Sequence, residues 1–224
     1  VTIRSASFAA AASAALSGNQ SKSFSGAGAC AGNGINRATA AVIKAQSSVT
    51  TSGDVTVEAS SQAGIAASIL SASLSIGVGR DGGALSVGIA IAKNTIGSTL
   101  TGSRVKAAIE TSKAASSAGK ISVLASNLQA IRAETFAAAV AVAGGKRGVA
   151  LSGTGAENTN IIATQTIASI EGKLSDSNGV SGQSVEVKAV NNSSVSSLTA
   201  AAAVSAAIGS TAVSLAIGVG RASN

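Results

Sequence analysis

Large apolar residues alternate with Ser, Gly or Ala along several stretches of the chain. Leu74, Ile76 and Val78 stand at every second position, and the same alternation runs through 85–91 and 213–219. A period of two residues is typical of a β-strand, because successive side chains of a strand point to opposite faces. Alanine-rich runs favour helix by propensity, but they are short here and end at glycines. We therefore expect strands.

The two faces of these expected strands differ in side-chain size. One face carries Val, Ile and Leu, whereas the other carries Ala, Ser and Gly. We expect the thin face to let another sheet or strand layer approach closely. The chain also contains no Pro, which would interrupt a stack of strands because it has no N–H to donate.

Two sequence markers recur along the chain at similar intervals. A strand-like triplet starts at Val1, Val55, Ile121 and Val185, and the first interval is the shortest. An Ala-x-Asn motif also recurs, and its last residues are Asn33, Asn94, Asn158 and Asn224. A common period in two independent markers predicts one continuous array of repeats of about 64 residues. The expected repeats are 1–54, 55–120, 121–184 and the partial repeat 185–224.

Repeats of this size do not bury their apolar face alone and must stack on their neighbours. We therefore predict an all-β chain that forms an elongated, repetitive β-solenoid similar to a parallel β-helix, with two or three coils per repeat. An antiparallel meander of stacked hairpins, turning at the glycine-rich corners 79–83 and 144–148, is the alternative. The spacing of the strands does not separate these two folds.

The composition excludes most catalytic chemistry. Ala, Ser and Gly make up half of the chain, and there is no His, Tyr or Trp. Without His, neither a Ser-His-Asp nor a Cys-His nucleophile system nor an imidazole zinc site is available. The 9 Asp and Glu residues are scattered singly, so the sequence contains no calcium-binding loop motif. We expect no enzyme, no cofactor and no metal site, and we expect Cys30 to be a small buried hydrophobe.

The chain is basic, with a net charge of +7. Its Lys and Arg residues are neither clustered on one segment nor interleaved with aromatic residues that would stack on bases, so we expect no nucleic-acid partner. The uncharged stretches 59–79 and 189–220 are long enough to span a membrane as helices. They are rich in Ser, Asn, Thr and Gly, however, and the equivalent stretch of another repeat is charged, which argues against such spans.

Two sets of residues recur at similar places in successive repeats. We predict that the asparagines of the Ala-x-Asn motif form a structural ladder at a strand corner, because Asn tolerates left-handed backbone and bonds to a stacked counterpart. Stacking would also line basic corner residues into a stripe able to meet an anionic polysaccharide or an anionic cell surface. Solvated charges that keep the chain soluble are the simpler interpretation. These corner residues are Lys22, Arg80, Lys146 and Arg147.

The order of segments within a repeat carries a resemblance. An Ala-rich strand, a Gly-rich corner, a strand such as 148–152 and then a motif such as 92–96 follow one another. This order resembles the repeat regions of giant bacterial surface exoproteins, the filamentous-haemagglutinin-like and large adhesin class. The resemblance implies export to the bacterial cell surface or the extracellular space, an extended β-solenoid stalk, and a role in adhesion, aggregation or a surface filament. The calcium-binding nonapeptide of related exoproteins is absent, so calcium dependence is not implied.

The function we expect is that of a non-catalytic structural or adhesive repeat module in a large exported surface or filament-forming protein. Its partners would be neighbouring repeats or identical chains, because the strand edges of a solenoid end pair readily with another molecule. The alternative is a membrane-active β protein, a barrel or pore, since strands of about ten alternating residues also suit a membrane. The lack of Tyr and Trp for interfacial girdles counts against that alternative.

Overall fold

The computed structural model of the chain describes residues 1–98, 103–171 and 179–224, which contain fourteen strands. The strands form four successive coils. The first contains β1 (Thr2–Leu16), β2 (Gln20–Ile35), β3 (Ala38–Ile43) and β4 (Ser48–Thr51). The second contains β5 (Val55–Val78), β6 (Asp81–Gly97), β7 (Arg104–Glu110) and β8 (Lys113–Ser116). The third contains β9 (Lys120–Gly144), β10 (Arg147–Ala163), β11 (Gln165–Glu171) and β12 (Val180–Ser181), and the fourth contains β13 (Ser184–Ile208) and β14 (Thr211–Ser223).

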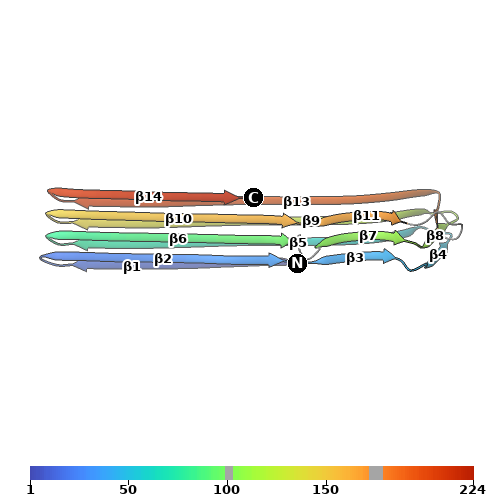
Figure 1. Cartoon of the computed structure of the whole chain (residues 1–224), viewed down its shortest axis with the longest axis horizontal. Helices are drawn as coiled ribbons and strands as arrows, with labels where there is room; N and C mark the ends of the chain where they lie inside the picture. Colours follow the sequence, from blue (N-terminus) through green and yellow to red (C-terminus); the bar gives the residue numbers. More distant parts are fainter. Residues whose placement is uncertain (99–102, 172–178) are drawn as a thin grey trace.

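Equivalent strands of successive coils lie side by side in four sheets (Figure 1). Sheet A has the order β1-β5-β9-β13, sheet B β2-β6-β10-β14, sheet C β3-β7-β11 and sheet D β4-β8-β12. Every strand pairing of the described residues is parallel. The prediction of an all-β parallel solenoid is confirmed, and the antiparallel meander is excluded. The expectation of two or three coils per repeat is wrong, because one repeat supplies one coil.

The register of the first coil differs from the one suggested by the strand-like triplets. Thr2 lies opposite Gly64 and Ile3 opposite Ile65, so that the triplet at Val1 does not correspond to the one at Val55. The triplets at Val55, Ile121 and Val185 do lie in register with one another. The short interval between Val1 and Val55 was therefore a coincidence of similar strand sequence, and it understates the length of the coil.

Each coil is a flat loop with two long sides (Figure 1). At about 3.3 Å per residue, the 25 residues of β9 span about 80 Å. Along most of that length sheet A packs on sheet B, and we call this thin part the arm. The remainder of sheet A packs against sheets C and D, and we call this part the base. The turns that join sheet A to sheet B form the tip of the arm.

The buried side chains become smaller from base to tip. In the base, Val and Ile residues such as Val57, Ile109 and Val123 form a conventional apolar core. Near the tip, the buried cluster consists of alanines alone, namely Ala84, Ala141, Ala143 and Ala150. Side-chain volume inside the coil therefore sets the distance between the two long sides.

The two sheets of the arm approach so closely that side chains of one reach the backbone of the other. Ser71 Oγ donates to the Ala27 carbonyl over 2.9 Å, and Ser152 Oγ donates to the Ala139 carbonyl over 2.8 Å. A Cβ atom placed on Gly77 would lie 2.1 Å from the Gly83 carbonyl oxygen. Sheets in ordinary proteins pack about 10 Å apart, so the interior of the arm is thin and closed by direct hydrogen bonds.

The large apolar residues of the arm point outward instead of into the core. Leu70, Leu74 and Val78 of β5 are exposed, whereas the serines between them are buried. The sequence predicted that the face with small side chains would let another sheet or strand layer approach closely. In the structure this second sheet is formed by the other long side of the same coils. The Val, Ile and Leu face is the outer surface of the arm.

Cys30 and the two uncharged stretches were also the subject of predictions from the sequence. Cys30 is exposed on the outer face of sheet B, opposite Ile91, and is not a buried hydrophobe. The uncharged stretches 59–79 and 189–220 form strands, chiefly β5, β13 and β14. In the described part of the chain no helix has the length and apolar character needed to cross a membrane.

If the close approach of the two sheets depends on small inner residues, Gly77→Val will destabilise the chain. The added side chain must displace the backbone at Gly83, and such overpacking costs about 1–3 kcal/mol. For a chain of this length we expect Tm to fall by about 2–10 °C, measured by circular dichroism at low protein concentration.

Gly34→Val is the matched control, because a Cβ atom on Gly34 meets nothing within 4 Å. Its free energy of unfolding should change by less than about 0.5 kcal/mol. Equal melting temperatures for the two variants would show that the arm is not closely packed.

Candidate functional site

A row of asparagine side chains runs through the stack, from the first coil to the fourth. Asn33 Nδ2 donates to Asn94 Oδ1 over 2.8 Å. Asn94 Nδ2 donates to Asn160 Oδ1 over 2.9 Å, and Asn160 Nδ2 donates to Asn224 Oδ1 over 2.8 Å. Asn94 and Asn160 are 0% and 1% exposed. We call these four residues the asparagine row.

The composition of this row corrects the predicted ladder. Asn33, Asn94 and Asn224 belong to it, but Asn158 does not, because Asn158 lies in register with Ala92 and Ala222. Asn160 takes its place. The row crosses sheet B near the ends of its strands: Asn33, Asn94 and Asn160 lie two or three residues before the ends of β2, β6 and β10, and Asn224 directly follows β14. Burial and a directed chain of amide hydrogen bonds give it a structural role.

Asn158 is fully buried beside the row, and neither polar atom of its side chain has a hydrogen-bond partner among the described residues. The sequence signal was ambiguous, because 156–160 contains asparagines at both 158 and 160. Asn94 and Asn160 are 66 residues apart, and the same interval separates the triplets at Val55 and Ile121. The agreement between these two intervals could have identified Asn160 as the member of the row.

The predicted basic stripe at the corners is interrupted by a carboxylate. Arg147 lies opposite Asp81 in the sheet, and its Nε and Nη2 atoms donate to the two carboxylate oxygens over 2.9 and 3.2 Å. Arg80 and Lys146 are exposed beside each other in the turns, whose backbones are joined by a hydrogen bond from Arg147 N to the Arg80 carbonyl. Sequence reasoning missed Asp81, although it stands next to Arg80 in the same corner.

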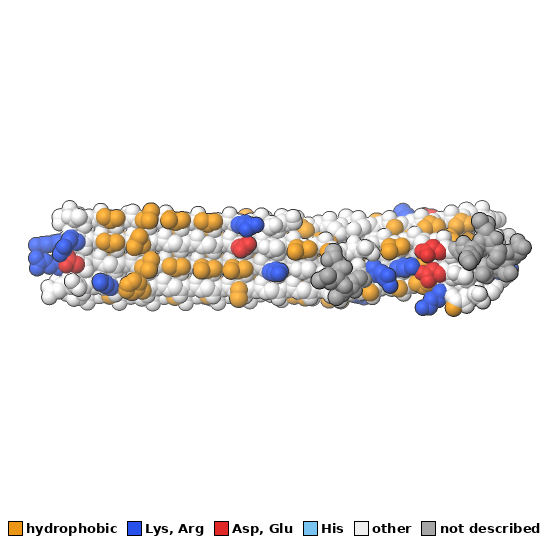
Figure 2. Space-filling view, in the orientation of Figure 1, with side chains coloured by type: hydrophobic (Ala, Val, Ile, Leu, Met, Phe, Trp, Pro, Cys, Tyr) orange, Lys and Arg blue, Asp and Glu red, His pale blue; other side chains and the backbone are white. Residues whose placement is uncertain are grey.

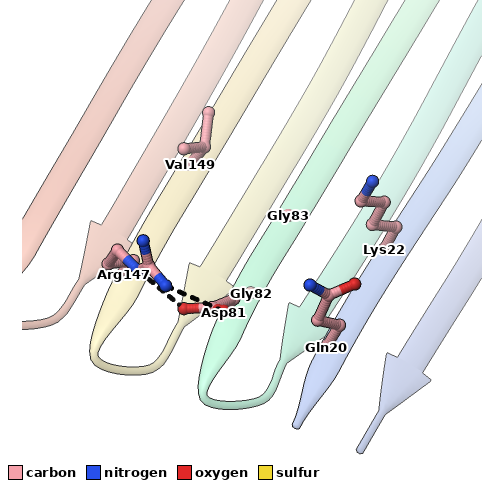
Figure 3. A pocket seen from close by; sticks show the side chains of 7 residues that line it. All are labelled: Gln20, Lys22, Asp81, Gly82, Gly83, Arg147 and Val149. Carbon is pink, nitrogen blue, oxygen red and sulfur yellow. Dashed lines mark hydrogen bonds and ion pairs between the residues drawn. The ribbon is translucent and has the colours of Figure 1, made fainter.

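Lys22 lies further along the arm, on the outer face of β2 and opposite Gly83. It lines a shallow, open hollow between the strand ends (Figure 3). In Figure 3 the Arg147 side chain points toward Asp81, with which it forms an ion pair, whereas Lys22 stands apart. The structure brings Arg80, Lys146 and Arg147 together at the tip and leaves Lys22 outside that group. The hollow is lined by Gln20, Lys22, Asp81, Gly82, Gly83, Arg147 and Val149.

A second amide cluster joins the arm to the base, and sequence reasoning missed it. Asn127 Nδ2 donates to Thr164 Oγ1 over 3.0 Å and to Asn191 Oδ1 over 3.2 Å. Thr164 in turn donates to Gln129 over 2.9 Å. Asn127 and Asn191 are 64 residues apart, which is the spacing of the repeat markers and would have been the signal for this pair.

The ionisable groups that line the hollow at the tip, Lys22, Asp81 and Arg147, lie at an open surface. No group of three or more His, Cys, Asp or Glu residues is placed to hold a metal ion in this part of the chain. On the outside of β7, the Lys106 ammonium group forms an ion pair and hydrogen bond with Glu110, which lowers the pKa of the Glu110 carboxyl. A carboxyl with a lowered pKa is ionised at neutral pH and is therefore no proton donor there.

The outer faces of the arm are the most unusual surface of the molecule. Figure 2 shows rows of hydrophobic side chains along one of them, bordered by charged side chains at the tip and further toward the base. On sheet B these rows include Leu85, Val87 and Ile89, of which Ile89 is 46% exposed. On sheet A, Phe8 is 69% exposed. Both faces of a thin two-layer arm are thus apolar.

The first and last coils of the stack carry open strand edges. Val1 N donates to the Gln62 carbonyl, and Gly64 N donates to the Val1 carbonyl. Because backbone groups of a strand alternate between its two sides, the odd residues of β1 bond to β5 and the even residues point away from it. The same reasoning places the even residues of β14 on its free side, since Thr211 N donates to the Lys146 carbonyl.

No protein-family model, curated protein or solved structure matches this chain. Its function is therefore inferred from the geometry of the chain itself.

The asparagine row predicts different effects on Tm for substitutions of two neighbouring asparagines. Asn160→Ala removes a donor and an acceptor from the row, and it leaves the buried Asn94 amide without its acceptor. Loss of a buried hydrogen-bond partner costs about 1–3 kcal/mol, so we expect a lower Tm. Asn158→Ala removes a buried amide that has no partner among the described residues and inserts the residue present at 92 and 222.

We therefore expect Asn158→Ala to leave Tm unchanged or to raise it. The two variants differ only in position along the same strand, so each is the control for the other in thermal unfolding. A lower Tm for Asn158→Ala than for Asn160→Ala would contradict the assignment of the row.

Proposed function

We propose that the chain is a non-catalytic structural module that extends by stacking further coils on its open edges. The added coils belong to neighbouring repeats or to identical chains, and the assembly acts as a stalk or filament. An adhesive role at a bacterial cell surface or in the extracellular space is part of the same proposal and comes from the resemblance of the repeats. The observation that carries the proposal is the pair of open parallel edges, β1 and β2 on one side and β13 and β14 on the other.

The two edges are complementary to each other. Within the chain, each coil lies on the next in parallel register, with backbone hydrogen bonds on every alternate residue. A further first coil would repeat these contacts on the fourth, placing Asn33 beside Asn224 and Phe24 beside Leu215. In the asparagine row each amide nitrogen donates toward the following coil. This direction is kept when copies stack head to tail, which generates an open filament and not a closed ring.

Other features of the chain suit an extended stack. Exposed parallel edges of this length are a template for pairing with another chain, and each added coil would bury a new set of small inner residues. The asparagine row adds side-chain hydrogen bonds to the backbone pairing, as ladders of Asn do in stacked identical strands.

The test of this proposal is a pair of proline substitutions on the free side of β1. Ala10 and Ala12 are even residues, so their backbone N–H groups point away from β5, and their side chains point outward. Ala10→Pro/Ala12→Pro removes two donors from the open edge without breaking a hydrogen bond inside the chain. We expect the wild-type chain to form rods or fibres in electron micrographs and this variant to form short particles or none.

Ala10→Ser/Ala12→Ser is the matched control, since it keeps both N–H groups and should assemble as the wild-type chain does. Circular dichroism establishes that the proline variant keeps its strands. A wild-type chain without rods at high concentration, or a folded proline variant that still assembles, would overturn the proposal.

A further inference from the structure

The outer face of sheet B in the arm carries an apolar patch with charged residues in its two end rows, Lys22 at one end and Glu157 and Arg221 at the other. Residues of the four strands that lie opposite one another form a row across the sheet. The patch consists of the outward residues of β2, β6, β10 and β14, from the row that contains Lys22 and Val213 to the row that contains Cys30 and Arg221. We call this surface the sheet B patch; it corresponds to the longer hydrophobic rows near the tip in Figure 2. Val213 is 59% and Ile217 55% exposed, so that large side chains are left in solvent.

The size of the patch is sufficient for a contact with a second molecule. It covers about 9 residues along each strand and four strands across, or about 30 by 19 Å at normal strand dimensions. The resulting area of about 570 Å² lies at the upper end of the range for the largest apolar patch of a typical monomer, about 300–600 Å², and such patches are often functional. A biological interface needs about 500 Å² on each partner, which this patch supplies.

In two neighbouring rows of the patch, ridges and grooves alternate from coil to coil, whereas the adjoining row has a large apolar side chain on every coil, with Leu85, Leu151 and Leu215 on the last three. Val87 of the second coil lies between Gly26 of the first and Gly153 of the third, and Ile217 of the fourth follows Gly153. One row further along, Ile89 and Val219 alternate with Gly28 and Gly155 in the same way. A Cβ atom on Gly28, Gly153 or Gly155 would meet nothing within 4 Å. The glycines therefore form open grooves beside the apolar ridges.

We propose that a second copy of the chain packs on this patch, face to face, about a two-fold axis parallel to the strands. An axis between β6 and β10 places the second coil of one copy opposite the third coil of the other, and the first opposite the fourth. Val87 and Ile89 then enter the groove at Gly153 and Gly155 of the partner copy. By the same symmetry, Ile217 and Val219 enter the groove at Gly26 and Gly28. Such an isologous contact is closed and self-complementary.

A second copy fits the patch better than a lipid surface does. The alternation of ridge and groove is a fixed shape that a solid partner matches, and fluid acyl chains have no corresponding order. Insertion into hydrocarbon would also immerse the free backbone groups of β2 and β14, each of which costs several kcal/mol without a hydrogen-bond partner. The pairing uses a face of the sheet and not its edges, so it is independent of the coil stacking proposed above.

The test fills the groove without disturbing the interior. Gly153→Leu/Gly155→Leu adds two outward side chains where the isolated chain has open space, and it leaves the partner's Val87 and Ile89 without their groove. Sedimentation equilibrium of the Ala10→Pro/Ala12→Pro chain, in which edge stacking is blocked, isolates the face-to-face pair. We expect that chain to be dimeric, and we expect the added leucines to raise the dimer Kd at least about tenfold.

The matched control is Ala6→Leu in the same proline background, because Ala6 is an exposed outward residue of sheet A on the opposite face. It should leave the dimer Kd unchanged. A monomeric proline variant at about 100 μM, far above the micromolar Kd typical of a weak specific pair, would overturn the proposal. A dimer unaffected by the leucines would do so as well, and so would a monomer that co-sediments with phosphatidylcholine vesicles, since this outcome assigns the patch to lipid.

A cross-linking measurement gives the symmetry directly and does not depend on the glycine variants. In a Cys30→Ala background, Leu85→Cys places one thiol in the second coil of each copy. The two thiols of the face-to-face pair would lie about 11 Å apart, given the normal strand and sheet spacings, and a short bis-maleimide should join them. Leu74→Cys, on the outer face of sheet A, is the control. Equal cross-linking of both variants would contradict the axis.

Discussion

The structure depends on the close contact between the two sheets of the arm. Serine hydroxyls of one sheet reach backbone carbonyls of the other, and a methyl group at Gly77 would collide with the backbone at Gly83. This distance is set by the small residues, chiefly Ala, Ser and Gly, on the inner side. Because a small inner volume limits how much apolar area is buried there, stability comes to depend on hydrogen bonds along the stack and on the Val and Ile core of the base.

The same contact explains the outer surface. A strand of period two has only two faces, and since one is reserved for small residues, the large apolar residues must face outward. The arm therefore has an apolar surface on both sides, a tip with charged turns, and open strand edges at the first and last coils. Stacking of further coils would cover the open strand edges, and pairing of the sheet B patch would cover the apolar surface of one side. The ion pair of Arg147 and Asp81 shows that charge at the tip is partly paired within the chain.

Much of the fold follows from local pattern, but the site residues follow from register. Alternation at Leu74, Ile76 and Val78 predicts the strand, and two recurring markers predict the parallel stack. The alternating pattern does not tell which face of an arm strand is buried, because one face is apolar and the other is small and uncharged. In the structure the face with the smaller side chains is the buried one. The asparagine row shows the second limit, since Asn158 and Asn160 both lie on the inner face of β10. Only the coil length, which differs from one coil to the next, places Asn160 opposite Asn94.

X-ray diffraction from crystals or aligned fibres of the chain measures the distance between the two sheets most directly. We expect a strand spacing of about 4.8 Å along the stack, together with a separation of sheets A and B in the arm well below the usual value of about 10 Å. A separation of about 10 Å throughout the arm, with the Val, Ile and Leu residues facing each other across it, would show that small inner residues do not hold the two sheets together.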